Sequence, residues 1–242
     1  MTSNVFFIFL LFLFILGGIG IFVINLKKEK QERQNAWIKY FVYLLIINIL
    51  FLSILYCRTL FWALIVLIVL GGGFELIRLQ LGLHQLKGFK FSIFLGIFIL
   101  VSFLFCLFGF GKQDFQAFTW LIVCSFDAFS QLSGQLFGKR KICPRISPNK
   151  TIGGTVGGTV ISMIISAIIG HYTGLNIIMA TIIGLGIASA SFAGDLAASY
   201  VKRQFAVKDF GRTFPGHGGF LDRFDSFIFA GAFVYLFHSF CQ

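Results

Sequence analysis

Apolar residues fill long uninterrupted runs along this chain, and short polar segments between the runs carry most of the charge. A helix needs ~20 mostly apolar residues to cross the hydrocarbon core of a bilayer. The runs are continuous, whereas the strands of a membrane barrel would alternate apolar and polar residues. The pattern therefore predicts an all-α, polytopic membrane helical bundle of about eight transmembrane helices. The predicted spans are 5–26, 40–57, 59–74 (the shortest), 91–110, 115–137, 153–170, 175–201 and 224–240.

The composition agrees with a protein that lies almost wholly in lipid. Of the 242 residues, 57% are hydrophobic and 12% are charged, and the mean hydropathy is +0.90. These values are atypical of a soluble globular domain. We expect one integral membrane unit, with N-terminal helices in 1–110 and the candidate chemistry in 111–242, and with the 34 Phe residues on lipid-facing surface.

The basic residues predict the topology, because Lys and Arg favour cytoplasmic loops. If the first loop, around Lys27 and Lys28, is cytoplasmic, alternation places all but two of the 20 basic residues inside, and only Arg58 and Lys112 fall outside. Both termini are then outside, and the segments 138–152 and 202–223 are cytoplasmic loops. Neither Lys nor Arg precedes the first span, and no small-residue cleavage site follows it, so we expect it to be retained.

The formal charge of +11 admits three interpretations. Topology alone explains basic cytoplasmic loops, attraction to anionic lipid headgroups explains them as well, and the third interpretation is phosphate binding. Nucleic acid is not an expected partner, because the basic residues are divided among several loops of a membrane protein. The five cysteines show no CxxC pair, so free thiols are expected.

Acidic residues inside predicted spans are functional candidates, because an ionised carboxylate at bilayer depth is costly. Glu75 lies at the end of the third span, three residues before Arg78, and a local ion pair is one explanation for it. Asp127 lies in a helix whose second half is polar enough to line a wet cavity. Asp195 lies among small residues that let helices approach closely.

Asp222 and Asp225 begin the last span. Three residues apart on a helix, they share a face, and a pair of carboxylates beside a phosphate substrate suits Mg²⁺. The alternative explanation is that acids at a helix N-terminus favour the helix dipole.

Two predicted cytoplasmic loops carry the remaining polar chemistry. The segment 215–219, PGHGG, brings glycine amides and His217 together, and such backbone can turn its amides toward phosphate oxygens. The segment 138–154, GKRKICPRISPNKTIGG, offers several cations beside Ser147, Asn149 and Thr151. Thr151 is also a plausible N-cap for the next helix, whose positive end would face an anion.

These residues resemble a known family. The stretch 199–225, SYVKRQFAVKDFGRTFPGHGGFLDRFD, looks like the signature of the phosphatidate cytidylyltransferases (CDP-diacylglycerol synthases), and Asp127 followed by ISPNKT resembles the family's other block. The likeness covers about 115–230. It departs from the family's usual pattern at Ile152 and Gly153, where Trp and Glu are common, and at Ser130 and Gln131, where Ala and Tyr are common.

The resemblance implies an Mg²⁺-dependent nucleotidyltransferase that joins phosphatidate to CTP and releases pyrophosphate, in the inner (plasma) membrane with its site on the cytoplasmic side. Room remains for a second cation, and family members tend to dimerise. The residues that we assign to catalysis are Asp195, Asp222, Asp225, Lys202, Lys208 and His217. Those assigned to substrate binding are Ser147, Lys150, Thr151, Arg203, Asp209, Gly216, Gly218, Gly219 and Arg223. Those assigned to metal are Asp195, Asp222, Asp225 and Asp127.

Three alternatives stay open at this point. A related enzyme could transfer cytidylyl to another lipid phosphate, or the chain could be a lipid kinase, although PGHGG together with DRFD argues against a kinase. From a different class, an ion-coupled transporter could use the buried acids, although we find no internal repeat of the kind that many transporters show.

Overall fold

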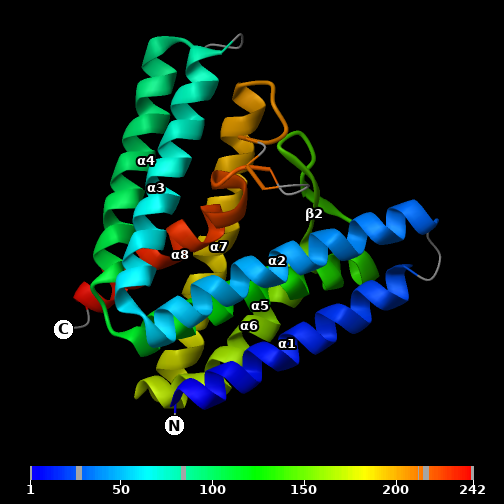
Figure 1. The fold of residues 1–242 in the computed structure, drawn as a ribbon, viewed down its shortest axis with the longest axis vertical. Coiled ribbons are helices and arrows are strands. Elements are labelled where there is room, and N and C mark those ends of the chain that lie inside the picture. Colours follow the sequence, from blue (N-terminus) through cyan, green and yellow to red (C-terminus); the bar gives the residue numbers. More distant parts are fainter. Residues whose placement is uncertain (1, 26–28, 83–85, 212, 215–217, 241–242) are drawn as a thin grey trace.

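The computed structural model describes residues 2–25, 29–82, 86–211, 213–214 and 218–240 (Figure 1). These parts of the chain are helical apart from one short hairpin and the connecting loops. The α-helices are α1 (Thr2–Asn25), α2 (Lys30–Tyr56), α3 (Arg58–Leu81), α4 (Gly88–Gly109), α5 (Gln113–Phe137), α6 (Ile152–Ile169), α7 (Ile177–Gln204) and α8 (Leu221–Phe240). A short 3₁₀ helix, η1 (Gly170–Thr173), follows α6.

The observed helices coincide with the apolar runs, and two of them extend beyond the predicted ends. Helix α2 begins at Lys30 rather than near residue 40. A helix forms its backbone hydrogen bonds internally, so it can also include the polar residues that precede the apolar run. Helix α3 continues to Leu81, about two turns past the predicted end at residue 74. The glycine run 71–73 does not interrupt α3, so Glu75 lies inside a helix rather than at its end.

Helices α2 to α4, α6 and α7 are long and apolar enough to cross a bilayer. These five segments are found within the described residues, and the third predicted span, the shortest of the eight, is among them. The all-α membrane-type fold is therefore confirmed, whereas the number of membrane crossings and the orientation of the termini stay predictions.

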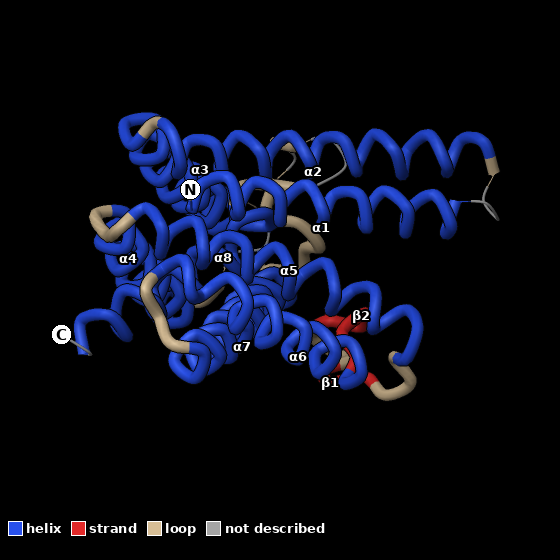
Figure 2. The backbone as a smooth tube through the Cα atoms, turned by 90° about the horizontal axis from the view of Figure 1, so that it is seen from below, coloured by secondary structure: helices blue, strands red, loops and turns tan. Residues whose placement is uncertain are grey.

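The helices form two groups that run in different directions. Helices α3 and α4 lie side by side along the longest dimension of the molecule, while α1, α2 and α5 run obliquely to them (Figure 1). Figure 2 shows α1 and α2 together at one edge of the molecule. Both ends of the chain lie toward one end of the molecule, and the end of α3, the start of α4, the end of α7 and the hairpin lie toward the other (Figure 1). The basic last turns of α3 and α7 are thus far from the two termini.

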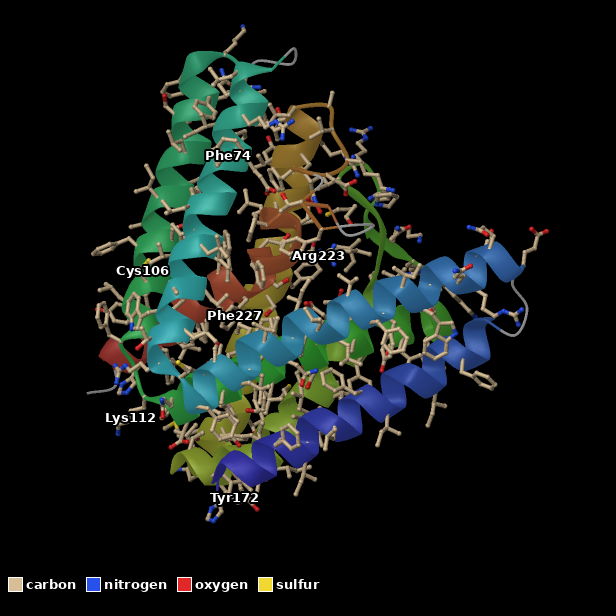
Figure 3. All side chains as sticks on the ribbon, viewed as in Figure 1. Phe74, Cys106, Lys112, Tyr172, Arg223 and Phe227 are labelled. Carbon is tan, nitrogen blue, oxygen red and sulfur yellow. The ribbon has the colours of Figure 1, made fainter. Side chains whose placement is uncertain are left out.

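Aromatic side chains form a core where α4, α5 and α8 meet. The ring of Phe227 contacts Phe105 at a centroid distance of 5.1 Å, Phe108 at 6.0 Å and Trp120 at 4.6 Å. Phe227 lies in the interior between these helices (Figure 3). The expectation that Phe covers lipid-facing surface is therefore wrong for part of the set, because several rings are fully buried between helices.

The hairpin was not predicted. Strands β1 (Lys141–Cys143) and β2 (Ser147–Thr151) pair antiparallel within the predicted loop 138–152, with Lys141 opposite Thr151 and Cys143 opposite Ser147. Two such short strands carry too little hydrophobic alternation to be recognised from sequence. Their pairing gives the loop a defined shape at the start of α6.

Candidate active site

The first cation of the site, Lys150, lies in strand β2 of the hairpin. Thr151 ends β2 and caps α6, because its side-chain oxygen accepts a hydrogen bond from the backbone N–H of Gly154 at 3.1 Å. This confirms the predicted N-cap. The cap orients the last residues of the hairpin, so Lys150 points toward α7 instead of outward into solvent.

Lys150 pairs with Asp195 of α7. Its Nζ atom lies 2.7 Å from Oδ2 of Asp195 and 4.5 Å from the centre of the Phe192 ring. Phe192 and Ser199 are three residues before and four residues after Asp195, so all three share one face of the helix. The Ser199 hydroxyl lies 3.4 Å from Oδ1 of Asp195, a long hydrogen bond. The Asp195 side chain is 41% exposed, so one side of this carboxylate remains open.

Close packing of α7 on α8 brings two further carboxylates toward Asp195. A Cβ atom added at Gly194 would lie 2.7 Å from the backbone oxygen of Asp225, so only glycine permits this approach. Asp127 of α5, Asp195 and Asp225 lie within electrostatic reach of one another, and Lys150, Lys202 and Arg223 offset part of their repulsion. The packing of small residues predicted around Asp195 is therefore present, and the fourth predicted metal ligand, Asp222, also acts electrostatically on Asp225.

Asp222 has a different environment from these three acids. Its Oδ1 atom lies 2.7 Å from Nζ of Lys202, and its Oδ2 atom accepts hydrogen bonds from the amides of Phe210 at 2.8 Å and Gly219 at 2.9 Å. The Asp222 side chain is only 2% exposed. Gly218, at φ 80°, turns the loop here, and a Cβ atom on it would lie 2.6 Å from Oδ2 of Asp222. Asp222 thus holds the α7–α8 loop against the start of α8.

Glu75 holds the same loop from the other side. Its Oε1 atom accepts hydrogen bonds from the Thr213 hydroxyl at 3.1 Å and the Phe220 amide at 2.9 Å, and Oε2 accepts from the Leu221 amide at 3.1 Å. The expected local pair of Glu75 with Arg78 is therefore replaced by contacts with residues 138 or more positions away. The extension of α3 past residue 74 is what turns this carboxylate inward.

Two arginines complete the cationic surroundings. Arg203 donates from Nε to the Ile146 oxygen at 3.1 Å and from Nη1 to the Val207 oxygen at 3.1 Å, so it joins the hairpin to the turn after α7. Arg223 lies near the middle of the molecule, toward the hairpin side (Figure 3). Its Nε atom is buried and has no hydrogen-bond partner among the described residues. That unused donor fits a ligand oxygen.

The structure shows fewer contacts for the other predicted site residues. Lys208 and Asp209 are exposed in the loop that follows α7, and Ser147 is half-buried at the start of β2. Gly219 is buried against the Glu75 carboxylate. Gly216 and His217 lie outside the described residues.

The carboxylates do not form a complete metal cage. Within the described ranges, no three His, Cys, Asp or Glu side chains converge closely enough to hold an ion alone. Mg²⁺ rarely uses such a cage, since it is usually held by one or two carboxylates together with substrate phosphates and water. Asp195, Asp225 and Asp127, which repel one another, therefore fit a divalent cation that arrives with a phosphorylated ligand.

A cavity at the other end of the molecule contains none of these residues. It has a volume of about 580 Å³ and is lined by Arg58, Lys112, Asp114 and His238 together with residues of the α4–α5 turn. Lys112 lies toward the same end as the chain termini, whereas Arg223 lies toward the hairpin (Figure 3). The candidate site is therefore a set of charged groups between helices and loops rather than this cavity.

Sequence reasoning missed part of the site. Glu75 was considered but assigned to a local partner, and the roles of Phe192, Thr213 and the Phe210 amide were not considered. The sequence signal for Glu75 was an acid at the end of a predicted span, two positions after three consecutive glycines. No sequence signal distinguishes a backbone amide such as that of Phe210 from its neighbours.

Comparisons with known proteins identify the family of the chain. The profile described as "Cytidylyltransferase family" matches residues 1–241. A phosphatidate cytidylyltransferase of Rickettsia typhi is 32% identical over 231 residues, which cover 87% of this chain and 99% of that protein. A phosphatidate cytidylyltransferase of Staphylococcus aureus is 40% identical over 114 residues, 46% of this chain and 44% of that protein.

A third relative, the Escherichia coli protein YnbB, is 44% identical over 116 residues, 48% of this chain and 39% of that protein. The chain thus matches less than half of the length of the Staphylococcus and Escherichia relatives, but nearly the full length of the Rickettsia protein. The match of the profile to almost every residue decides the classification: this chain belongs to the cytidylyltransferase family.

Proposed function

We propose that this protein is a phosphatidate cytidylyltransferase, which converts CTP and phosphatidate to CDP-diacylglycerol and pyrophosphate in phospholipid biosynthesis. The observation that carries the proposal is the contact of Lys150 with Asp195, with Asp127, Asp225 and Arg223 within electrostatic reach, in a chain that belongs to the cytidylyltransferase family. The names of the Rickettsia and Staphylococcus relatives support the choice of phosphatidate.

The proposed setting is an integral membrane protein of the inner (plasma) membrane, with eight crossings and both termini outside. The basic last turns of α3 and α7, which lie far from the termini, support this topology. The acids and cations lie toward the end that carries these basic turns, so the site would face the cytoplasm. A diacyl phosphate keeps its headgroup at this interface, where CTP can reach it.

The reaction requires two polyanions to meet. A phosphate oxygen of phosphatidate attacks the α-phosphorus of CTP, a new P–O bond forms, and the bond to the leaving pyrophosphate breaks. No protein nucleophile is needed, so catalysis rests on positioning and on neutralising charge. Lys150 and Arg223 have the placement to contact phosphate oxygens, and Arg203 holds the hairpin that carries Lys150.

Asp195, Asp225 and Asp127 would hold Mg²⁺, and their combined charge leaves room for a second cation. When bound there, Mg²⁺ would supply positive charge that offsets the negative charge developing on the leaving group. Asp222, which we first assigned to metal and catalysis, is better explained as a support. Both of its oxygens are occupied, and its side chain is almost completely buried.

The decisive experiment is a turnover assay on the purified protein with CTP labelled in the cytosine ring. With phosphatidate and Mg²⁺, we expect the label to enter the lipid fraction, and we expect excess EDTA to stop this and added Mg²⁺ to restore it. Labelled lipid formed equally well in EDTA would contradict the role of the metal. Absence of labelled lipid from a folded preparation supplied with CTP, phosphatidate and Mg²⁺ would contradict the proposed reaction.

A second candidate is cytidylyl transfer to another lipid phosphate. The observation that favours this candidate is the departure from the family's usual pattern at Ser130, Gln131, Ile152 and Gly153. Offering a series of lipid phosphates in the same assay, each alone and then in competition, separates the candidates by the ratio of kcat/KM values. A preference for phosphatidate supports the main proposal.

A further inference from the structure

The contact between α3 and the start of α8 joins the N-terminal helices to the candidate site. We propose that Glu75, together with the glycine face formed by Gly71 and Gly72, is the positioning element that sets α8 and its carboxylates for cytidylyl transfer. The inference rests on the proposed function for its kinetic consequence, but its structural part can be tested without turnover.

Both carboxylate oxygens of Glu75 accept hydrogen bonds from the loop and from the start of α8. The side chain belongs to a residue that is only 3% exposed, and its two oxygens take three hydrogen bonds from Thr213, Phe220 and Leu221. Such a carboxylate has no free oxygen pointing to solvent and is poorly placed to contact a substrate. Its role must therefore be exerted through the residues that it holds.

The donors that Glu75 holds are those that a helix cannot satisfy internally. Helix α8 begins at Leu221, and the first amides of a helix have no partner within it. Glu75 accepts the amides of Phe220 and Leu221, while Asp222 accepts the amide of Gly219. The start of α8 is thus capped by two carboxylates, one of its own and one from a helix about 145 residues earlier. Negative charge at this end also suits the helix dipole.

Glycines allow this close approach. A Cβ atom on Gly71 would lie 2.7 Å from the Phe220 ring, and one on Gly72 would lie 2.8 Å from the Leu221 side chain. On the loop side, a Cβ atom on Gly219 would lie 2.1 Å from the Glu75 carboxylate, and one on Gly211 would lie 2.5 Å from it. The Glu75 carboxylate, Gly71 and Gly72 of α3 therefore pack against Gly211 and Gly219 of the loop and against the start of α8. We call this contact the seat of α8.

The position of the seat sets the position of the reacting groups. Asp222 follows directly after the residues that Glu75 holds, and Asp225 lies one turn further along α8. Arg223, with its unpaired Nε atom, lies between them. A small shift or rotation of the first turn of α8 would move all three relative to Asp195, and misplacement of catalytic groups on this scale is costly to turnover.

The first test is Glu75→Gln, which keeps the size of the side chain but cannot accept from all three donors. We expect faster amide hydrogen exchange in the segment 218–224, with the exchange of α5 and α6 unchanged. We expect kcat to fall by about tenfold or more, with KM for CTP changed much less. Unchanged exchange in 218–224 would overturn the proposal, as would a raised KM with unchanged kcat.

A matched pair of glycine variants keeps the test independent of charge. Gly71→Ala and Gly73→Ala make the same substitution in the same helix, and both raise intrinsic helix propensity. At Gly73, however, the new Cβ atom would lie 3.4 Å from the Phe98 ring of α4, an ordinary contact. We expect Gly71→Ala to reproduce the exchange and kcat effects of Glu75→Gln, and Gly73→Ala to behave like the wild type. Equal behaviour of the two alanine variants would overturn the proposal.

The two readouts separate this inference from the proposed reaction. If the wild type transfers no cytidylyl group to any lipid phosphate, the proposed function fails, while the exchange comparison still tests the seat. If the wild type is active and Glu75→Gln and Gly71→Ala leave the exchange of 218–224 unchanged, only the inference fails.

Discussion

The site contains two lysine–aspartate pairs of equal length and different character. Lys150 meets Asp195 at 2.7 Å, and Lys202 meets Asp222 at the same distance. The Asp195 side chain is 41% exposed, whereas that of Asp222 is 2% exposed. The length of an ion pair therefore does not reveal what the pair does.

The surrounding donors explain the difference. Asp222 takes two backbone amides in addition to its lysine, so its charge is compensated inside the protein. Among the described residues, Asp195 has only the long contact with Ser199 besides its lysine. In the proposed reaction, Lys150 would leave Asp195 for a phosphate and a cation would take its place, since one side of the carboxylate is open. Lys202 cannot leave Asp222 without stranding a buried charge, which is expensive.

The largest effect expected from this comparison is on turnover, at the open pair. Asp195→Asn removes a carboxylate that we assign to metal, and a metal contribution of several kcal/mol corresponds to a loss of about a thousandfold in kcat. Because the group is partly exposed, the thermal unfolding midpoint in detergent should change little. Turnover within tenfold of the wild type would exclude a metal role for Asp195.

The second effect is on stability, at the buried pair. Asp222→Asn leaves Lys202 without its counter-charge, and breaking a buried pair in this way costs about 3 kcal/mol or more of unfolding free energy. We expect a clearly lower unfolding midpoint, with turnover per folded molecule reduced less than in Asp195→Asn. The opposite pattern, a stable protein without turnover, would support the original assignment of Asp222 as a metal ligand.

The smallest effect concerns the lysine of the open pair. Lys150→Gln removes a cation that we assign to substrate phosphate, and one lost charge-assisted hydrogen bond corresponds to about a tenfold rise in KM for CTP. The matched change Lys202→Gln should instead lower the unfolding midpoint. If the two lysine variants raise KM equally and leave stability equal, the two pairs do not differ in function.

The sequence predicted well those features that depend on a few neighbouring residues. The apolar runs located the helices, because a buried backbone in lipid must satisfy its own hydrogen bonds. Thr151 was recognised as a cap because capping involves residues three positions apart. The close approach around Gly194 followed from a local cluster of small side chains.

The features that the sequence did not predict depend on residues far apart in the chain. Glu75 has an arginine three positions away, and nothing local shows that its partners lie 138 to 146 residues later. Asp222 and Asp225 look equivalent in DRFD, yet only Asp222 meets a lysine of the preceding helix. The hairpin was missed because its strands are short and are stabilised by pairing rather than by a hydrophobic pattern.

The sequence alone determined that this is a helical protein of the membrane type, with acids inside long apolar segments and with basic connecting segments. Each residue is hydrophobic or charged in any conformation. The pattern of these residues along the chain is therefore enough to predict which segments are suited to a bilayer and which to water. Only the tertiary structure decided which carboxylate remains open, which is used as a support, and which helix holds the start of α8. Burial and hydrogen-bond partners depend on the packing of distant helices, and this packing leaves one carboxylate open and buries another of the same chemistry.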